Sequence, residues 1–114
     1  MKISNITFPT PLDQLNPANG NCDVFIQLED GSTYTFVCTT PFGLSEFMER
    51  EDVSFIPPAQ PDIIVKELTE KIIREAIESY AEEDAFWLKI YAVADHSREV
   101  LDMDKINQAL KVNK

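Results

Sequence analysis

The strongest local pattern in the sequence is CDVFIQLEDGSTYTFVCT, residues 22–39. Apolar and polar side chains alternate on both sides of the Asp-Gly pair at 30–31, as expected for two half-buried strands joined by a tight turn. A two-residue loop would place apolar side chains of one strand opposite polar side chains of the other. A three-residue loop, residues 29–31, sets Cys22 opposite Cys38 and keeps the apolar faces aligned. We therefore expect a β-hairpin with a three-residue loop and its glycine at a positive φ.

The segment before this hairpin predicts one more strand. Ile3, Ile6 and Phe8 indicate a short first strand, and residues 9–21 follow as a loop rich in Pro and Asn. A loop of this length is unusual in a small domain, and such loops are commonly either functional or poorly ordered.

A short helix is predicted directly after the hairpin. Thr40 is expected to cap it, and Pro41 suits its first position because proline has no N–H to donate there. Its apolar side consists of residues at helical spacing, namely Leu44, Phe47 and Met48. Residues 53–56 are expected to add a brief strand before the next prolines.

The second half of the chain alternates strand and helix patterns. Residues 62–66 are a β-branched run typical of a buried strand, and residues 69–82 carry the apolar stripe of the main helix. Residues 85–93, AFWLKIYAV, are apolar on both sides of an extended chain, so we expect a central strand. The two strands and the helix between them would form a right-handed parallel crossover.

The last segment predicts a short helix over residues 102–112. Asp102 is its expected N-cap, and Leu101 with Ile106 would form a hydrophobic staple. Ala109 and Leu110 are expected to continue the buried side of this helix. Residues 105–114 contain three lysines and no acidic residue, and they are the only segment with a clear positive charge.

These patterns predict a single α+β domain spanning residues 1–114. We expect a mainly antiparallel sheet of about four to six strands, with one main helix packed on a face and one or two short helices. Prolines at 57, 58 and 61 form a rigid connector, residues 57–61, between a β-rich first half and a β-α-β-α second half.

The charge of the chain restricts its partners. The sequence has 20 acidic and 10 basic residues, a net charge of −10 and a pI near 4.4. Binding to nucleic acid or to an anionic membrane requires clustered Lys and Arg, so we expect neither partner. No apolar run is long enough to cross a membrane and residues 1–4 open no signal peptide, so we expect a cytoplasmic protein. Its size and composition are typical of small soluble bacterial proteins.

The excess negative charge gathers in two blocks, residues 46–52 and 82–84. Each block precedes a predicted strand, and strands that run alike would gather both blocks at one end of the sheet. A field of this kind attracts a cationic partner. The candidate partner-binding residues are these acids together with two aromatic residues: Glu46, Glu49, Glu51, Asp52, Glu82, Glu83, Asp84, Trp87 and Tyr91.

Trp87 and Tyr91 share one face of the strand predicted over residues 85–93. A base-stacking surface would need interleaved basic residues, and only Lys89 qualifies. Core packing or a dimer interface explains these aromatic residues better. The chain has few elements left to cover this face, so we expect a second subunit or a partner to bury it.

The sequence offers little support for catalysis, metal binding or a cofactor. Asp95-His96-Ser97 is consecutive in sequence, so its side chains would not converge as a catalytic triad requires. Cys22 and Cys38 lack the C-x-x-C spacing of redox and zinc motifs, and we expect them to be reduced and buried. No metal-ligand motif and no glycine-rich nucleotide loop is present, so we expect no catalytic residues, no metal and no cofactor.

These observations favour a non-enzymatic protein-interaction module. Its most specific form is an inhibitor or immunity-type protein that masks a basic partner through the two acidic blocks. Alternatively, the acidity serves only to keep the protein soluble. Two further alternatives stay open: a small enzyme that uses carboxylate or Cys–His chemistry, and an obligate homodimer with a structural role.

Overall fold

A computed structural model of the chain describes residues 1–58, 61–95 and 102–112. The strands in these residues are β1 (Ile3–Thr7), β2 (Asn21–Leu28), β3 (Thr33–Thr39) and β4 (Asp62–Ile64). The helices are the 3-10 turn η1 (Leu12–Gln14), α1 (Pro41–Arg50), α2 (Glu70–Tyr80), α3 (Glu82–Asp95) and α5 (Met103–Val112). The predicted α+β class is confirmed.

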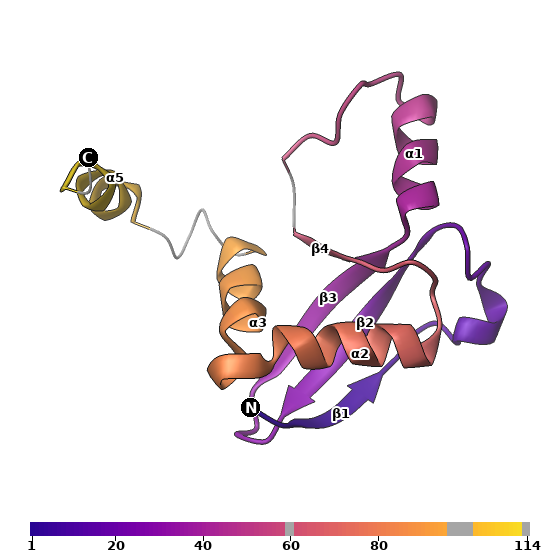
Figure 1. Cartoon of the computed structure of the whole chain (residues 1–114), viewed down its shortest axis with the longest axis horizontal. Coiled ribbons are helices and arrows are strands. Elements are labelled where there is room, and N and C mark those ends of the chain that lie inside the picture. Colours follow the sequence, from indigo (N-terminus) through magenta and orange to yellow (C-terminus); the bar gives the residue numbers. More distant parts are fainter. Residues whose placement is uncertain (59–60, 96–101, 113–114) are drawn as a thin grey trace.

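The four strands of the described chain form one open, mixed sheet in the order β1-β2-β3-β4 (Figure 1). The two pairings among β1, β2 and β3 are antiparallel, and β4 lies parallel to β3. The expectation of four to six mainly antiparallel strands is therefore met only in part. The parallel pairing arises because α1 carries the chain away from the end of β3 before it returns as β4.

The β2–β3 hairpin has the predicted register. Cys22 lies opposite Cys38 and Val24 opposite Phe36. The Leu28 N–H donates to the Ser32 carbonyl at 2.9 Å, which closes the three-residue loop, and Gly31 has a φ of +87°. This φ lies in the left-handed region that glycine adopts without steric cost.

The hydrophobic core lies on one face of the sheet. Side chains along β2 alternate strictly between exposed and buried, which is the pattern of a strand covered on one side. Helices α2 and α3 lie across that face (Figure 1). The core comprises Ile6, Cys22, Val24, Ile26, Leu28, Phe36, Cys38, Ile63, Val65, Leu68, Ile73, Ile77, Ala81, Ala85 and Leu88.

Helices α1 and α2 form as predicted. The Thr40 hydroxyl accepts a hydrogen bond from the Gly43 N–H at 3.0 Å, and Pro41 is the first residue of α1. Thr69 caps α2 in the same way, and the apolar stripe of α2 faces the sheet through Ile73 and Ile77. Both caps satisfy backbone donors that a helix start otherwise leaves unpaired.

The prediction of a central strand over residues 85–93 is wrong, because this segment belongs to helix α3. Ala85 and Leu88, three residues apart, are buried, whereas Phe86 and Ile90 are exposed. A run that is apolar at nearly every position fits the period of a strand and that of a helix equally well. The predicted parallel crossover is therefore also wrong, because it needed this strand. The second half of the described chain has the element order β-α-α-α.

Residues 53–56 form no strand either. Phe55 and Ile56 are exposed, and this short run pairs with no other strand. Pro57, which follows, has no N–H to donate to a strand partner.

The C-terminal helix exists, but its predicted buried side is exposed. The Asp102 carboxylate accepts hydrogen bonds from the Asp104 and Lys105 N–H groups at 3.0 and 3.2 Å, which confirms the N-cap. Ala109 and Leu110 are exposed because α5 lies apart from the sheet (Figure 1). The predicted staple involves Leu101, which is outside the described residues.

Leu88 and Ile90 would share one face of a strand, but they lie on different sides of helix α3. The helix therefore predicts that replacing each of them by alanine lowers the stability of the protein by different amounts. Leu88 is fully buried and Ile90 is 44% exposed. We expect Leu88→Ala to lower the free energy of unfolding by about 2–5 kcal/mol and Ile90→Ala by less than about 1 kcal/mol. Urea denaturation at high dilution measures both, and equal losses would contradict the helix.

Candidate functional site

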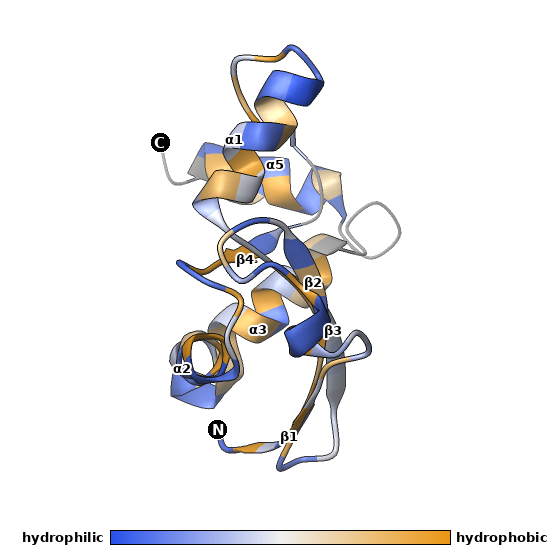
Figure 2. Ribbon diagram, turned by 90° about the vertical axis from the view of Figure 1, so that its right-hand side faces the viewer, coloured by the Kyte–Doolittle hydropathy of each residue, from blue (hydrophilic) through white to orange (hydrophobic). Residues whose placement is uncertain are grey.

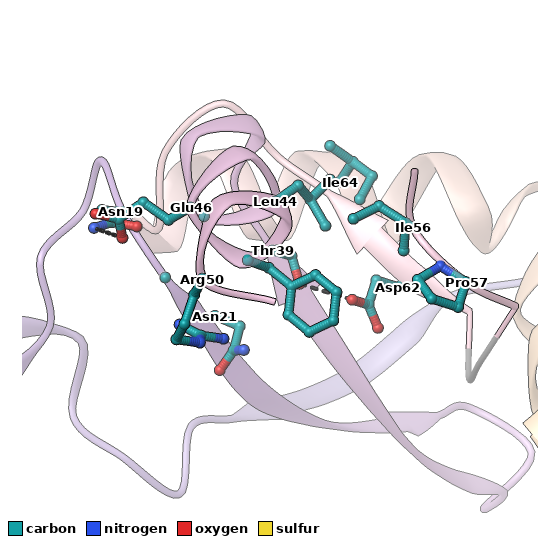
Figure 3. A pocket seen from close by; sticks show the side chains of 13 residues that line it. Asn19, Asn21, Thr39, Leu44, Glu46, Arg50, Ile56, Pro57, Asp62 and Ile64 are labelled. Atoms are coloured by element: carbon teal, nitrogen blue, oxygen red, sulfur yellow. Dashed lines mark hydrogen bonds between the residues drawn. The ribbon is translucent and has the colours of Figure 1, made fainter. Parts of the chain in front are cut away.

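A surface groove of about 740 Å³ lies where α1, the end of β3 and β4 meet (Figure 3). Its apolar lining consists of Leu44, Phe47, Ile56, Pro57 and Ile64. Its polar lining consists of Asn19, Asn21, Thr39, Glu46, Arg50 and Asp62. The groove thus combines an apolar surface with a small number of polar and charged groups, as binding sites in proteins usually do.

Close backbone packing holds α1 at one side of the groove. The Thr40 N–H donates to the Gly20 carbonyl at 3.1 Å. A Cβ atom at Gly43 would lie only 2.9 Å from the Gly20 carbonyl oxygen and 3.0 Å from its nitrogen. The loop before β2 and the first turn of α1 can therefore touch only because residue 43 is glycine.

The parallel pairing of β3 with β4 builds the polar side of the groove. The Thr39 hydroxyl donates to the Asp62 carboxylate at 2.9 Å (Figure 3). On the opposite side, the Asn19 amide donates to the Glu46 carboxylate at 2.6 Å. An ionised carboxylate has about four acceptor positions, so each of these acids can accept further hydrogen bonds from a ligand.

Arg50 is the cation among the described residues that line the groove, and its charge is offset by its neighbours. Its Nε lies 3.5 Å from Glu51 Oε1, and its guanidinium lies 5.7 Å from the centre of the Phe47 ring. The ion pair with Glu51 and the cation–π contact with Phe47 both stabilise the Arg50 guanidinium in this position. With Glu46 and Asp62 also present, negative charge exceeds positive charge among the lining residues that the structure describes.

The two acidic blocks predicted as a joint binding surface lie at opposite ends of the molecule (Figures 1 and 2). Glu46 and Glu49 lie on α1, Glu51 and Asp52 follow it, and Glu82, Glu83 and Asp84 lie where α2 turns into α3. The expected convergence is wrong because neither of the strands that would have aligned the blocks exists. Of these residues only Glu46 lines the groove.

The turn between α2 and α3 has an unusual backbone. Glu83, Asp84 and Ala85 have φ values of 52°, 63° and 58°, which is left-handed backbone at three residues that are not glycine. Such residues persist only where the surrounding structure holds them. Here the buried side chain of Ala85 and the 3.1 Å hydrogen bond from its N–H to the Ala81 carbonyl hold the turn.

Trp87 and Tyr91 lie on α3 but in different surroundings. Tyr91 is half-buried, and its ring lies 5.2 Å from the Tyr80 ring and 6.4 Å from the Phe36 ring. Trp87 is 53% exposed and contacts Phe86 edge-on at 5.3 Å. Tyr91 therefore belongs to the packing between helices and sheet, whereas Trp87 lies on the surface.

Sequence reasoning placed only Glu46 of the groove residues among its candidates, and the hydrogen-bonded pair that it missed is Thr39 and Asp62. They are 23 residues apart and meet only because β4 pairs with β3 in parallel. The local signal was Asp62 itself, an acidic residue at the start of a β-branched run and directly after the proline connector.

Both cysteines are reduced, buried and directly opposite each other. Burial raises the pKa of the Cys22 thiol above its ordinary value, and it raises the pKa of Cys38 to about 12. The thiolate is the nucleophilic form, so these thiols are poor nucleophiles at neutral pH. The predictions that involve His96 lie outside the described residues.

The described residues hold no group of three or more His, Cys, Asp or Glu side chains that could bind a metal ion. None of the helices described is long and apolar enough to span a bilayer.

The environment of the cysteines predicts that Ellman's reagent reacts very slowly with the native protein at mildly alkaline pH. Both thiols should react once the protein is unfolded in guanidinium chloride, because burial no longer suppresses the thiolate. The folded state binds the Cys38 proton more tightly than the unfolded state does. This difference contributes to the free energy of unfolding in full below pH 9.0, and the contribution is lost as the pH rises toward about 12. Rapid labelling of either thiol in the native protein would contradict this account.

The contact at Gly43 predicts that Gly43→Ala destabilises the protein although it favours helix. We expect the free energy of unfolding to fall by about 1–2 kcal/mol, because the backbone clash outweighs the roughly 1 kcal/mol that Ala gains over Gly in a helix. Ser45→Ala, at an exposed position of the same helix, is the control and should change little. A gain in stability for Gly43→Ala would contradict the close approach.

No known protein family, curated protein or solved structure was found to match this chain. The chemistry of the groove and the charge of the chain are therefore the features from which its function is inferred.

Proposed function

We propose that this protein is a non-enzymatic interaction module that holds a cationic, partly apolar segment of a partner protein in the groove between α1 and β4. The observation that carries the proposal is the combination of an apolar surface with Glu46 and Asp62 in one groove, on a chain with a net charge of −10. A cytoplasmic protein is the expected partner.

The two carboxylates are placed to bind basic side chains. In the structure each accepts one hydrogen bond from a neutral donor, from Thr39 to Asp62 and from Asn19 to Glu46. These bonds orient the carboxylates without neutralising them. A Lys or Arg of the partner would then form charge-assisted hydrogen bonds, which are about twice as strong as neutral ones.

The apolar surface supplies the part of the affinity that salt does not screen. Ile56 and Ile64 are about half exposed, and both line the groove (Figure 3). Removing apolar surface from water contributes about 25 cal/mol per Å². A segment that alternates basic and apolar side chains would therefore satisfy both parts of the lining.

The remaining acids of α1 strengthen attraction without direct contact. Glu49, Glu51 and Asp52 lie on or just after the helix that forms one side of the groove. Their field would steer a cationic segment toward it and raise the association rate. The block at 82–84 lies at the other end of the molecule, where screening within about 8–10 Å at physiological salt limits its effect.

The competing interpretations receive less support. The inhibitor interpretation required the two acidic blocks to form one binding surface. The blocks lie at opposite ends of the molecule, so this form of the interpretation is not supported. An enzyme based on cysteine would need an accessible thiolate, and both thiols are buried. The interpretation that acidity serves only solubility stays open, and it predicts that no single carboxylate matters more than another.

The groove predicts selective binding of a fluorescein-labelled octapeptide of alternating Lys and Leu, measured by fluorescence anisotropy across a salt series. We expect binding that weakens as salt rises, and a much weaker signal for the matching Glu–Leu peptide. Glu46→Gln should weaken binding of the Lys–Leu peptide about two- to fivefold, which is the range for an exposed ion pair.

Glu78→Gln is the matched control, because it removes the same charge at an exposed position of α2, which does not line the groove. If Glu78→Gln weakens binding as much as Glu46→Gln, then overall charge and not the groove binds the peptide. Ile64→Thr provides a second check, because it keeps a β-branched residue in β4 but reduces the apolar surface. Unchanged affinity in both groove variants would contradict the proposed function.

A further inference from the structure

Helix α3 has an uncovered apolar stripe on the side that faces away from the sheet. The stripe consists of Phe86, Trp87, Ile90 and Val93, all of them exposed. Their spacing places them on one side of the helix, opposite the buried Ala85 and Leu88. Contiguous exposed apolar surface of this kind marks an interaction site more often than single exposed residues do.

Helix α5 carries a second stripe with the same length. Met103, Ile106 and Leu110 lie at i, i+3 and i+7, and Met103 and Leu110 are both 58% exposed. Isolated helices shorter than about 12–15 residues are marginal in water, and α5 has 10 residues. A helix of this length depends on packing its apolar side against another surface.

Antiparallel packing of the two helices brings opposite charges together at the start of α3. Both stripes extend over seven residue steps, about 10.5 Å along a helix. Antiparallel packing sets Met103 beside Val93 and brings Lys111 to the start of α3, where Glu82 and Glu83 are exposed. Asp84 is already paired with Lys89 at 3.1 Å, so these two glutamates supply the negative charge.

We propose that α5 of one copy packs antiparallel on the α3 stripe of a second copy, and the reverse, to form a two-fold symmetric homodimer. In the structure α5 extends away from its own sheet and from α3 (Figure 1). The radius of gyration is 16.0 Å, against about 13 Å for a compact chain of this length. Exchange of an extended element between copies is a low-cost route to a dimer.

The dimer interface and the α1–β4 groove are separate surfaces. Neither α1 nor β4 contributes to the α3 stripe, so each dimer would present two grooves. A partner with two basic segments could then bind with higher avidity than one groove allows. The peptide assay measures the groove alone, so either proposal can fail without the other.

Trp87 is the single tryptophan of the chain and reports directly on the stripe. Sedimentation velocity and Trp87 emission are measured together over a concentration series of the full chain. We expect dimer at high concentration, with Trp87 emission shifting to the blue as dimer forms. Leu110→Asp should weaken the dimer at least tenfold. Phe42→Asp is the control, because Phe42 is equally exposed at 58% but lies on α1.

A charge exchange tests whether the contact is made between copies. Lys111→Glu and Glu83→Lys should each weaken the dimer severalfold through like-charge repulsion. An equimolar mixture of the two variants should restore it, because each α5 then meets an α3 of opposite charge in the other chain.

Three results would overturn the proposal. The first is a monomer at all concentrations with solvent-exposed Trp87 emission. The second is a monomer with blue-shifted emission that Leu110→Asp reverses, which would mean that α5 packs on its own α3. The third is a dimer that Leu110→Asp leaves intact, or one that mixing of the charge variants fails to restore.

Discussion

The register of the β2–β3 hairpin is the constraint on which the rest of the structure depends. Side chains alternate between the two faces of a strand, so a shift of one residue would turn every apolar side chain to the opposite face. The three-residue loop with Gly31 sets Cys22 opposite Cys38 and gathers the apolar side chains of both strands on one face. That face is the surface on which α2 and α3 pack. The same register determines where β3 ends, and therefore where α1 begins.

The groove follows from the way the chain leaves and re-enters this sheet. A strand can be followed by a parallel neighbour only if a crossover carries the chain back to the same end of the sheet. Here α1 and the segment after it make that connection, and β4 returns beside β3 with Asp62 within hydrogen-bond distance of Thr39. The space between the crossover helix and the edge strand is the groove. Gly43 holds α1 close to the loop before β2, so the position of the groove is set by backbone contact rather than by flexible side chains.

Sequence reasoning succeeded where one pattern had one interpretation. The hairpin, the capped start of α1 at Thr40 and the amphipathic α2 each combine a period with a specific start or turn residue. It failed for residues 85–93, because a run that is apolar at nearly every position satisfies the helical and the extended period alike. The groove could not be predicted, since Thr39 and Asp62 meet through a parallel pairing that neither segment encodes by itself. The charge blocks were correctly located along the chain, but their positions in space depended on the two strands that do not exist.

The incorrect strand and the exposed stripe of α3 have one cause. A segment that is apolar on every side requires cover on two sides, whether it is a strand within a sheet or a helix within a bundle. Folding as a helix gives Ala85 and Leu88 the sheet as cover, but it leaves Phe86 and Trp87 facing outward. Within the described chain, α2 lies on the same face of the sheet as α3, and α5 stands apart (Figure 1). The sequence of this segment therefore requires a second surface to bury the outward-facing side of α3. A second chain can meet this requirement, because every copy carries both the uncovered stripe and a helix, α5, with Lys111 in its last turn and an apolar side of the same length.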